Sequence, residues 1–575
     1  MAGNKKDSDL QNLPVCVTEF IKLVIKKMRY RRSVRLEVAA ELSAHFEDEL
    51  KNCATDQERE QKARQIITDF GDAKLLGILL RRAKKRCRPV WRTVVARTFQ
   101  TIGVLILLFV LYTGWFLTGR PTISVDYLAV WNQMSRPQIK DEDNAWPHYE
   151  KAVALYTEPN QELNDTHEFT APGRISLDSL TDDQQQKIKK WVELNESAWQ
   201  EFVKAGSKSY CYREYQYGPN TKNEDKWLFN VILPHLAELR GLARLGRWQA
   251  RIQIDANQPR QALEDCLSIV RCGSHWQGKG TLVEQLVGLA INSLACEEIL
   301  NIAGTKDLSP VDLKHLQESL LQIYPQSFPL MNVEGERICF LDVVQHLFTE
   351  GGPGGGHLVP HKLTYLGDIT GSADEVRINM VRLPFYTAAA MVHAGRDETI
   401  AKGNEIYGLQ INRAKMSPYQ RHISDPNGVN DMILKLSKYR FFLIHIIMPA
   451  IDRASEIAYR GKASHQATIT ILALRRWRLE KNEYPANLDE LVAAGYLKEL
   501  PADPFSDKPL VYKKTDDDFT LYSIGPNFKD DGGESGVDTR GEAKKWKDNG
   551  DTVFWPVPEF SKEPQGEVGV ISSGK

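Results

Sequence analysis

Five carboxylates gather in a glycine-rich stretch near the end of the chain. They are Asp530, Asp531, Glu534, Asp538 and Asp551. Calcium binds six to eight oxygen atoms, supplied by carboxylates and carbonyls. Gly532, Gly533 and Gly536 let the backbone turn its carbonyls toward a cation. The pattern therefore predicts a calcium site, and a solvated acidic loop is the alternative that carries the same residues.

A second group of reactive side chains surrounds the run Gly351–Gly356 (GGPGGG). Three imidazoles, from His346, His357 and His361, are enough to bind zinc. Pro360 opposes a regular helix between the last two, so ordinary surface or core histidines are the better interpretation. The glycine run lacks the lysine and the strand–helix context of a phosphate loop, which predicts a flexible loop instead.

Acid–base chemistry has one candidate location, in residues 330–430. Glu334 and Glu336 lie on one predicted helix with Arg337 and Asp342, where a salt-bridged helix face is the commoner arrangement. If Glu334 and Glu336 converge with His357 and His361 in a pocket, an extracytoplasmic hydrolase or carbohydrate-active enzyme is the alternative function. The sequence contains no GxSxG, HExxH or SxxK motif, so nothing in it indicates an enzyme.

The longest uncharged stretch of the chain predicts on which side of a membrane the candidate site residues lie. Thr98–Gly119 has 22 residues without a charged side chain, and at about 1.5 Å rise per residue a helix of this length crosses a hydrocarbon core of about 30 Å. Arg81–Arg97 carries eight Arg or Lys and no acid. The positive-inside rule then places the N-terminus in the cytoplasm and the residues after 120 outside it. A buried core helix and a cleaved signal peptide explain the pattern less well.

The expected fold is mainly α. The predicted order is a cytoplasmic helical module (1–80), a basic juxtamembrane segment (81–97), a transmembrane helix (98–119), an extracytoplasmic helical domain (120–325), a helical and loop region with the glycine-rich break (326–449), a small α+β domain (450–561) and a flexible tail (562–575).

Periodicity and punctuation predict individual elements. Thr181 is the expected N-cap of one helix and Pro259 lies in the first turn of another. Further helices are expected over 384–410, over 439–450 as a buried core helix, and over 450–482. Alternation predicts strands at 510–512, 519–523 and 552–555.

Two segments resemble known families. ELSAHFEDEL (41–50) and the Phe70-Gly71-Asp72 turn resemble the permease-prefix or HAAS-type helical domain of bacterial membrane proteins. This resemblance implies a small cytoplasmic interaction or signalling module.

Residues 463–555 resemble the C-terminal domain of the major pseudopilin of type II secretion systems, the G-type subunit. The matching features are Tyr484-Pro485, Tyr496-Leu497, Asp503-Pro504-Phe505, Tyr512 and Leu521-Tyr522-Ser523-Ile524-Gly525. The family implies a calcium site in the loop after the Tyr-Ser strand. More than 300 residues separate the apolar helix from this segment, and Phe505 stands where the family usually has Trp. The resemblance therefore implies a reused fold rather than a pilus subunit.

The net charge bears on the class of binding partner, and the cysteines bear on disulfide formation. The net charge of −1 gives no argument for nucleic acid, and the basic run suits anionic lipid headgroups. Five of the eight cysteines fall on the expected outer side without a CxxC motif, which leaves disulfide pairing open. We expect a single-pass protein of the bacterial inner membrane that acts as a non-enzymatic interaction or scaffold component, with the lipid bilayer and envelope proteins as partners, alongside a secretion or pilus-like assembly. Its oligomeric state stays open.

Overall fold

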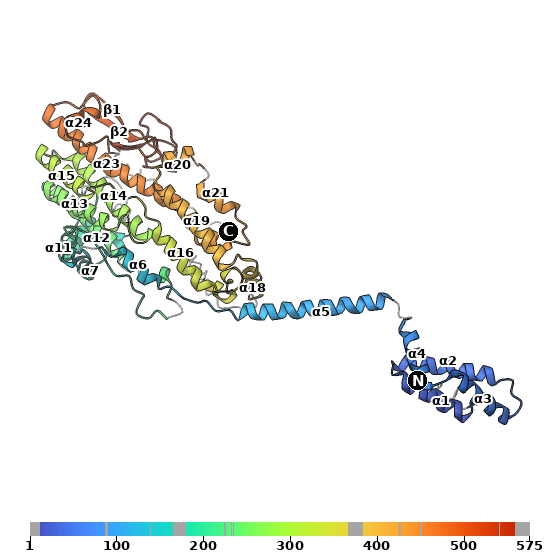
Figure 1. Cartoon of the computed structure of the whole chain (residues 1–575). Coiled ribbons are helices and arrows are strands. Elements are labelled where there is room, and N and C mark those ends of the chain that lie inside the picture. Colours follow the sequence, from blue (N-terminus) through green and yellow to red (C-terminus); the bar gives the residue numbers. More distant parts are fainter. Residues whose placement is uncertain are drawn as a thin grey trace, which may run out of the picture. The chain divides into compact units, whose positions relative to one another are not determined.

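The chain is mainly α-helical and ends in a small sheet (Figure 1). It divides into two compact units, Met1–Trp115 and Phe116–Lys575, called here the inner and outer units. The computed structural model describes residues 12–86, 90–137, 140–164, 169, 177, 180–222, 226–231, 233, 235–365, 383–424, 426, 428–448, 451–539 and 541–557. The predicted tail, 562–575, lies outside these residues.

The inner unit packs its helices around an aromatic cluster. The helices are α1 (Val15–Met28), α2 (Arg32–Leu50), α3 (Asp56–Phe70) and α4 (Ala73–Arg86). Phe20, Phe46 and Phe70 meet with ring centroids 5.5 to 6.3 Å apart, and His45 adds an edge contact to Phe70 at 5.5 Å. Gly71, at a φ of 74°, ends α3. The two motifs that carry the permease-prefix resemblance therefore meet in one core.

Helix α5 (Val90–Leu117) contains the predicted span. Among the described residues, two helices are long and apolar enough to cross a membrane. These are the segment Val94–Leu117 and helix α14 (Leu282–Thr305). None of the apolar window in Val94–Leu117 is buried, whereas 72% of the window in α14 is buried inside the outer unit. The mean hydropathy is 2.1 in the first helix and 1.4 in the second, and burial separates them further.

The first part of the outer unit is a helical array that begins after α6 (Tyr127–Ser135). Its members are η1 (Asp141–Asp143), α7 (Trp146–Leu155), α8 (Gln161–Asn164), α10 (Asp182–Leu194), α11 (Glu196–Gly206), η4 (Leu228–Asn230), α12 (Leu236–Asp255), α13 (Pro259–Trp276), α14 and α15 (Pro310–Ile323). Thr181 caps α10 as predicted, in a capping box with Gln184. Pro259 begins α13, where its missing N–H costs nothing.

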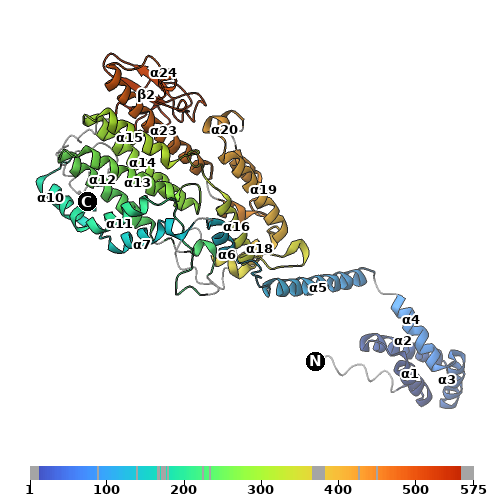
Figure 2. The same cartoon turned by 60° about the vertical axis from the view of Figure 1, so that its left-hand side comes forward.

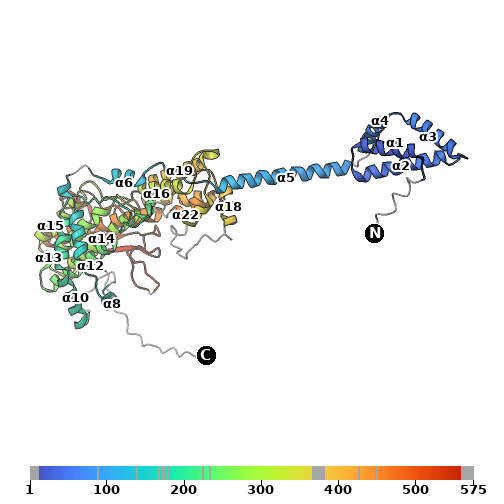
Figure 3. The ribbon, with the colours of Figure 1, turned by 90° about the horizontal axis from the view of Figure 1, so that it is seen from below.

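The second part surrounds one long helix. Its members are α16 (Glu334–Leu347), η5 (Pro353–Gly355), η6 (Pro360–Tyr365), α18 (Leu383–Val392), α19 (Arg396–Ala414), α20 (Pro418–Ser424), α21 (Gly428–Lys435), α22 (Phe442–Ile447), α23 (Ile451–Lys481) and α24 (Asp489–Ala493). Figure 3 shows α16, α18, α19 and α22 grouped together within the outer unit.

Helix α23 joins the two hydrophobic cores of the outer unit. Its first half, from Ile451 to Ala458, packs into a core with α16, α18 and α19. Its second half, from Ala463 to Leu474, packs into a core with α12 to α15 and the sheet. Figure 2 shows α23 running alongside α14 and α15 toward the sheet. The long helix therefore makes the C-terminal segment part of the same packed body.

The sheet is antiparallel, in the order β1 (Val511–Lys514), β2 (Phe519–Ser523) and β3 (Thr552–Trp555). Tyr522 lies opposite Val511 on one side and Val553 on the other. Phe519 and Trp555 stack with ring centroids 5.6 Å apart and carry the sheet onto the helical core. The three predicted strands form at nearly the predicted positions.

Two predicted elements differ from the structure. The helix expected over 384–410 breaks between α18 and α19, because the N–H of Ala394 donates to the Arg440 carbonyl, at 2.8 Å. The buried helix expected over 439–450 is shortened to α22, and Tyr439 is 79% exposed. The glycine run forms an exposed turn that is packed only at its end, where a Cβ on Gly355 would lie 2.1 Å from the Asp397 carboxylate, and its flexibility stays a prediction.

A buried carboxylate holds the loop before the sheet to β2. Asp503 is fully buried and accepts four hydrogen bonds. They come from the Phe505 N–H (3.0 Å), the Ser506 hydroxyl (3.2 Å), the Ser523 hydroxyl (2.6 Å) and the Ile524 N–H (3.0 Å). Two of the motifs shared with the pseudopilin family are therefore tied together by one side chain. A buried carboxylate is stable only when it is compensated in this way.

We expect Asp503→Asn to lower the free energy of unfolding by about 1–3 kcal/mol, because an amide NH₂ then faces donors. The measurement is thermal unfolding of the detergent-solubilised chain. Asp507→Asn is the matched control: Asp507 is exposed in the same loop, at a φ of 53° that asparagine tolerates. Equal melting of the two variants would show that the Asp503 network does not stabilise the fold.

Candidate functional site

Three of the five predicted calcium ligands lie together beside β2. Asp530 accepts hydrogen bonds from the Tyr522 hydroxyl and the Gly532 N–H, each at 2.9 Å. Asp531 accepts one from the Asn527 amide at 2.6 Å. Asp551, almost fully buried, accepts from the N–H groups of Asp531 (3.2 Å) and Gly533 (2.7 Å). The carboxylate of Asp551 thus organises the loop that carries the other two.

The remaining two carboxylates have other places. Glu534 is exposed, and its backbone carbonyl accepts from the Asp551 N–H at 2.8 Å. Asp538 lies in a short hairpin, where its carboxylate accepts from the Glu542 N–H at 3.2 Å. The ammonium of Lys513 donates to the Gly532 carbonyl at 2.9 Å. A cationic side chain of the protein itself therefore already borders the acidic group.

The electrostatics differ among these carboxylates. The Gly532 N–H lowers the pKa of Asp530, and the charge of Lys513 adds to this effect. Burial raises the pKa of Asp551, and the neighbouring charges of Asp530 and Asp531 raise it further. A divalent cation placed here would relieve that repulsion. Among the described residues, however, no three His, Cys, Asp or Glu side chains are placed to hold a metal ion together. Calcium binding therefore stays a prediction.

The three histidines of the zinc interpretation have separate partners. His346 stacks on Trp227 at 4.7 Å, and its Nδ1 bonds the Asp342 carbonyl at 2.9 Å. His357 stacks on Phe116 at 4.2 Å and donates through Nε2 to the Phe116 carbonyl at 3.1 Å. Burial lowers the pKa of His357 and of His361. His346 and His357 thus pack on aromatic rings and bond backbone carbonyls.

The carboxylates of the hydrolase alternative do not converge with these histidines. Glu334 pairs with Arg337, and Glu336 accepts from the Leu282 N–H at 3.0 Å. Both glutamates lie at the start of α16. His357 is held by Thr349, two residues beyond the end of that helix. The ten residues from Glu336 to His346 alone span about 15 Å at a helical rise. The four side chains therefore form no common pocket.

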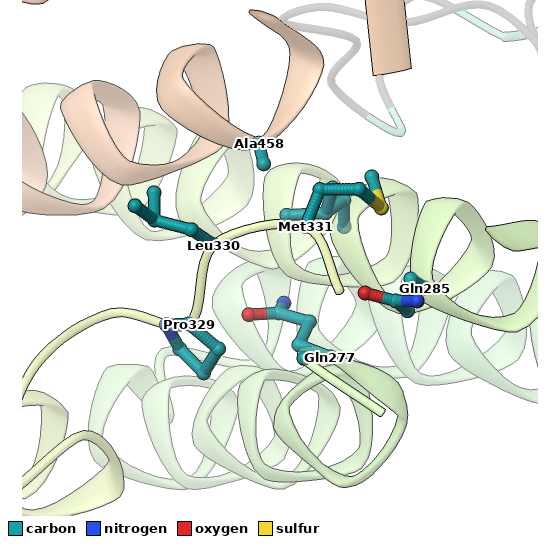
Figure 4. Close-up of a pocket in the computed structure, with 8 residues that line it drawn as sticks. Gln277, Gln285, Pro329, Leu330, Met331 and Ala458 are labelled. Atoms are coloured by element: carbon teal, nitrogen blue, oxygen red, sulfur yellow. The ribbon is translucent and has the colours of Figure 1, made fainter. Parts of the chain in front are cut away.

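Two small pockets flank the turn between α13 and α14. The first lies between Gln277, Gln285, Pro329, Met331 and neighbouring residues and has no room for a water-sized molecule (Figure 4). The second has a volume of about 10 Å³ and is lined by Trp146, Arg213, His235, Trp276 and Glu284, among others. Ligand pockets usually have volumes of about 300–1,000 Å³. Both are too small to enclose a typical small-molecule substrate.

One buried pair has the residue types of a nucleophile and its base. The Cys296 sulfur lies 3.9 Å from Nδ1 of His465. Burial raises the pKa of Cys296 to about 12 and lowers that of His465 to about 4, so both are neutral near pH 7. Cys211 and Cys272 are equally buried, with pKa values raised to about 12. All described cysteines are free thiols. These cysteines act as small apolar core residues.

Aromatic side chains at the two ends of α5 are further candidate residues. Trp91 is 61% exposed near one end, and Tyr112 and Trp115 are about half exposed near the other, 5.9 Å apart. Tryptophan and tyrosine at the ends of an apolar helix are typical of membrane–water interfaces. The positions of these aromatic residues at the two ends of the apolar stretch can be recognised in the sequence. Nothing in the sequence indicates that His357 binds Phe116.

Comparison of the chain with protein-family models, with curated proteins and with solved structures gave no match. The permease-prefix and pseudopilin resemblances therefore stay predictions that depend on the quoted residues.

We expect Asp551→Asn to lower the melting temperature, because its NH₂ group must face one of two backbone donors, at a cost of about 1–3 kcal/mol. The calcium prediction requires more. Millimolar CaCl₂ must raise the melting temperature of the original chain, a chelator must reverse the rise, and Asp531→Asn must reduce it. An unchanged melting temperature in calcium would leave a hydrogen-bonded loop and no metal site.

Proposed function

We propose that this protein is a single-pass protein of the bacterial inner membrane that presents a helical binding unit outside the cytoplasm. The observation that carries the proposal is the exposed apolar surface of α5. Between residues 99 and 111 of this helix, ten large apolar side chains are at least 45% exposed: Phe99, Ile102, Val104, Leu105, Ile106, Leu107, Leu108, Phe109, Val110 and Leu111. Soluble proteins rarely expose a contiguous apolar surface of this extent. A bilayer is the medium in which it is stable.

Orientation follows from the charges beside the helix. The eight basic residues of Arg81–Arg97 precede the apolar stretch, and Arg120 is the basic residue that follows it closely. Cytoplasmic flanks carry the excess of Lys and Arg. We therefore place the inner unit in the cytoplasm and the outer unit in the periplasm or another extracytoplasmic space.

A binding function without catalysis suits the outer unit best. Its candidate acids and histidines are engaged by partners at opposite ends of α16. The two pockets beside α13 and α14 have cavity volumes of at most about 10 Å³, which favours recognition over an extended surface. Helical arrays present such surfaces to protein partners. We propose envelope proteins as those partners, and the resemblance of 450–561 to a pseudopilin domain suggests a secretion or pilus-like assembly. No observation favours the hydrolase alternative.

Charges in the centre of α5 should release the chain from the membrane. Leu105→Arg combined with Leu108→Arg adds a cost of about 5–7 kcal/mol to insertion. We expect the double variant to leave the carbonate-resistant membrane fraction. The control is Val311→Arg, at a 67% exposed position on α15, which should stay in that fraction. Retention of the double variant would contradict a transmembrane α5.

Thiol labelling tests the orientation independently. A cysteine introduced at Val311 should react with a membrane-impermeant maleimide in intact spheroplasts. Cys16 and Cys53, both partly exposed in the inner unit, should react only after lysis. The reverse order of labelling would place the outer unit in the cytoplasm and overturn the proposed orientation.

A further inference from the structure

Helix α18 has an apolar face that the described part of the outer unit leaves exposed. The segment Leu383–Val392 contains no charged residue. Ala390 on one side packs into the core with α16 and α19, and Tyr386 and Met391 pack against that core. On the other side, Phe385 is 73% exposed and Val392 is 54% exposed, with exposed Ala388 between them. The spacing i, i+3, i+7 places these three on one face of the helix.

This face lies close to the point where the apolar helix α5 ends. Phe116, in the last turn of α5, is 2% exposed and belongs to the same core as α18. His357 holds it by a ring stack and by the hydrogen bond to its carbonyl. Three residues after His357, η6 begins, and α18 packs against η6. Phe116, His357, η6 and α18 therefore belong to the same part of the outer unit.

A second exposed aromatic side chain lies beside the end of α18. The hydrogen bond from Ala394 to Arg440 fixes the turn that carries Tyr439 next to this helix. Tyr439 is 79% exposed, with Lys438 and Arg440 on either side of it in the sequence. Arg120, which directly follows the span, acts electrostatically on His361 in η6. Apolar, aromatic and basic groups thus share the region around the end of α5.

We infer that the exposed face of α18 rests in the extracytoplasmic membrane–water interface, beside the exit of α5. The occupant of this face is then the lipid surface itself. The burial of Phe116 supports this choice, because the last turn of α5 belongs to the same core of the outer unit as α18. An uncharged helix face can enter the boundary between headgroups and acyl chains. Tyrosine and basic side chains suit the headgroup level.

The inference rests on the proposed transmembrane role of α5, and the test separates the two. The full chain, with Cys16, Cys53, Cys87 and Cys339 replaced by serine, receives one new cysteine labelled with an environment-sensitive fluorophore. The positions are Phe385 and Val392 on the α18 face, Leu108 in α5 and Val311 on α15. Figures 1 and 2 place α15 and α18 at opposite ends of the outer unit. The chain is reconstituted in nanodiscs of phosphatidylethanolamine and phosphatidylglycerol brominated either near the headgroup or at mid-chain.

We expect the Phe385 and Val392 probes to be quenched mainly by shallow bromines, the Leu108 probe mainly by deep bromines, and the Val311 probe by neither. Quenching at Leu108 without quenching at Phe385 and Val392 overturns the inference and leaves the span intact. A Phe385 probe that is shielded from water but not quenched by lipid indicates a protein occupant and also overturns it. Absence of quenching at Leu108 overturns the proposed span, and the inference with it.

Discussion

The apolar surface of α5 is the constraint on which the interpretation of this molecule depends. Helix α14 has the same length as the span segment and also passes a composition test for a membrane helix. Its apolar side chains are buried against α12, α13 and α23, which pack around it. Among the described residues, the apolar window within Val94–Leu117 has no such cover. Transfer of apolar surface out of water is the largest favourable term in protein assembly. In the proposed membrane role of α5, lipid supplies this favourable transfer.

Packing in the outer unit shows why segments far apart in the sequence belong together. Helix α23 contributes to both cores, so residues before 325 and after 450 share one interior. Arg251 and Glu298 form a buried bidentate pair within that interior, with N–O distances of 2.8 to 3.1 Å, and Arg251 lies over the Trp248 ring. Such a pair adds little net stability but strongly disfavours any arrangement that separates its members.

Signals within a few residues predicted most helices and strands. Contacts between residues far apart in the sequence determined where some of them break and how they pack. The cap at Thr181, the first-turn Pro259 and the alternation of 519–523 act within a few residues, so the sequence alone located α10, α13 and β2. The break at Ala394 depends on Arg440, and Phe116 depends on His357, 241 residues away. The acidic loop shows the same limit. The sequence shows that this loop contains many carboxylates. Only the fold shows that the N–H groups of Asp531 and Gly533 donate to Asp551.

The free thiols of the outer unit have a consequence for an oxidising compartment. Cys266, Cys272 and Cys296 are at most 2% exposed, and the first two lie in the core that joins the helical array to the sheet. Oxidants and alkylating reagents act on accessible thiolates, so they reach these sulfurs only when the core opens. Opening of a core requires global or sub-global unfolding. The rate at which these thiols are alkylated in the native chain therefore reports how often this core opens.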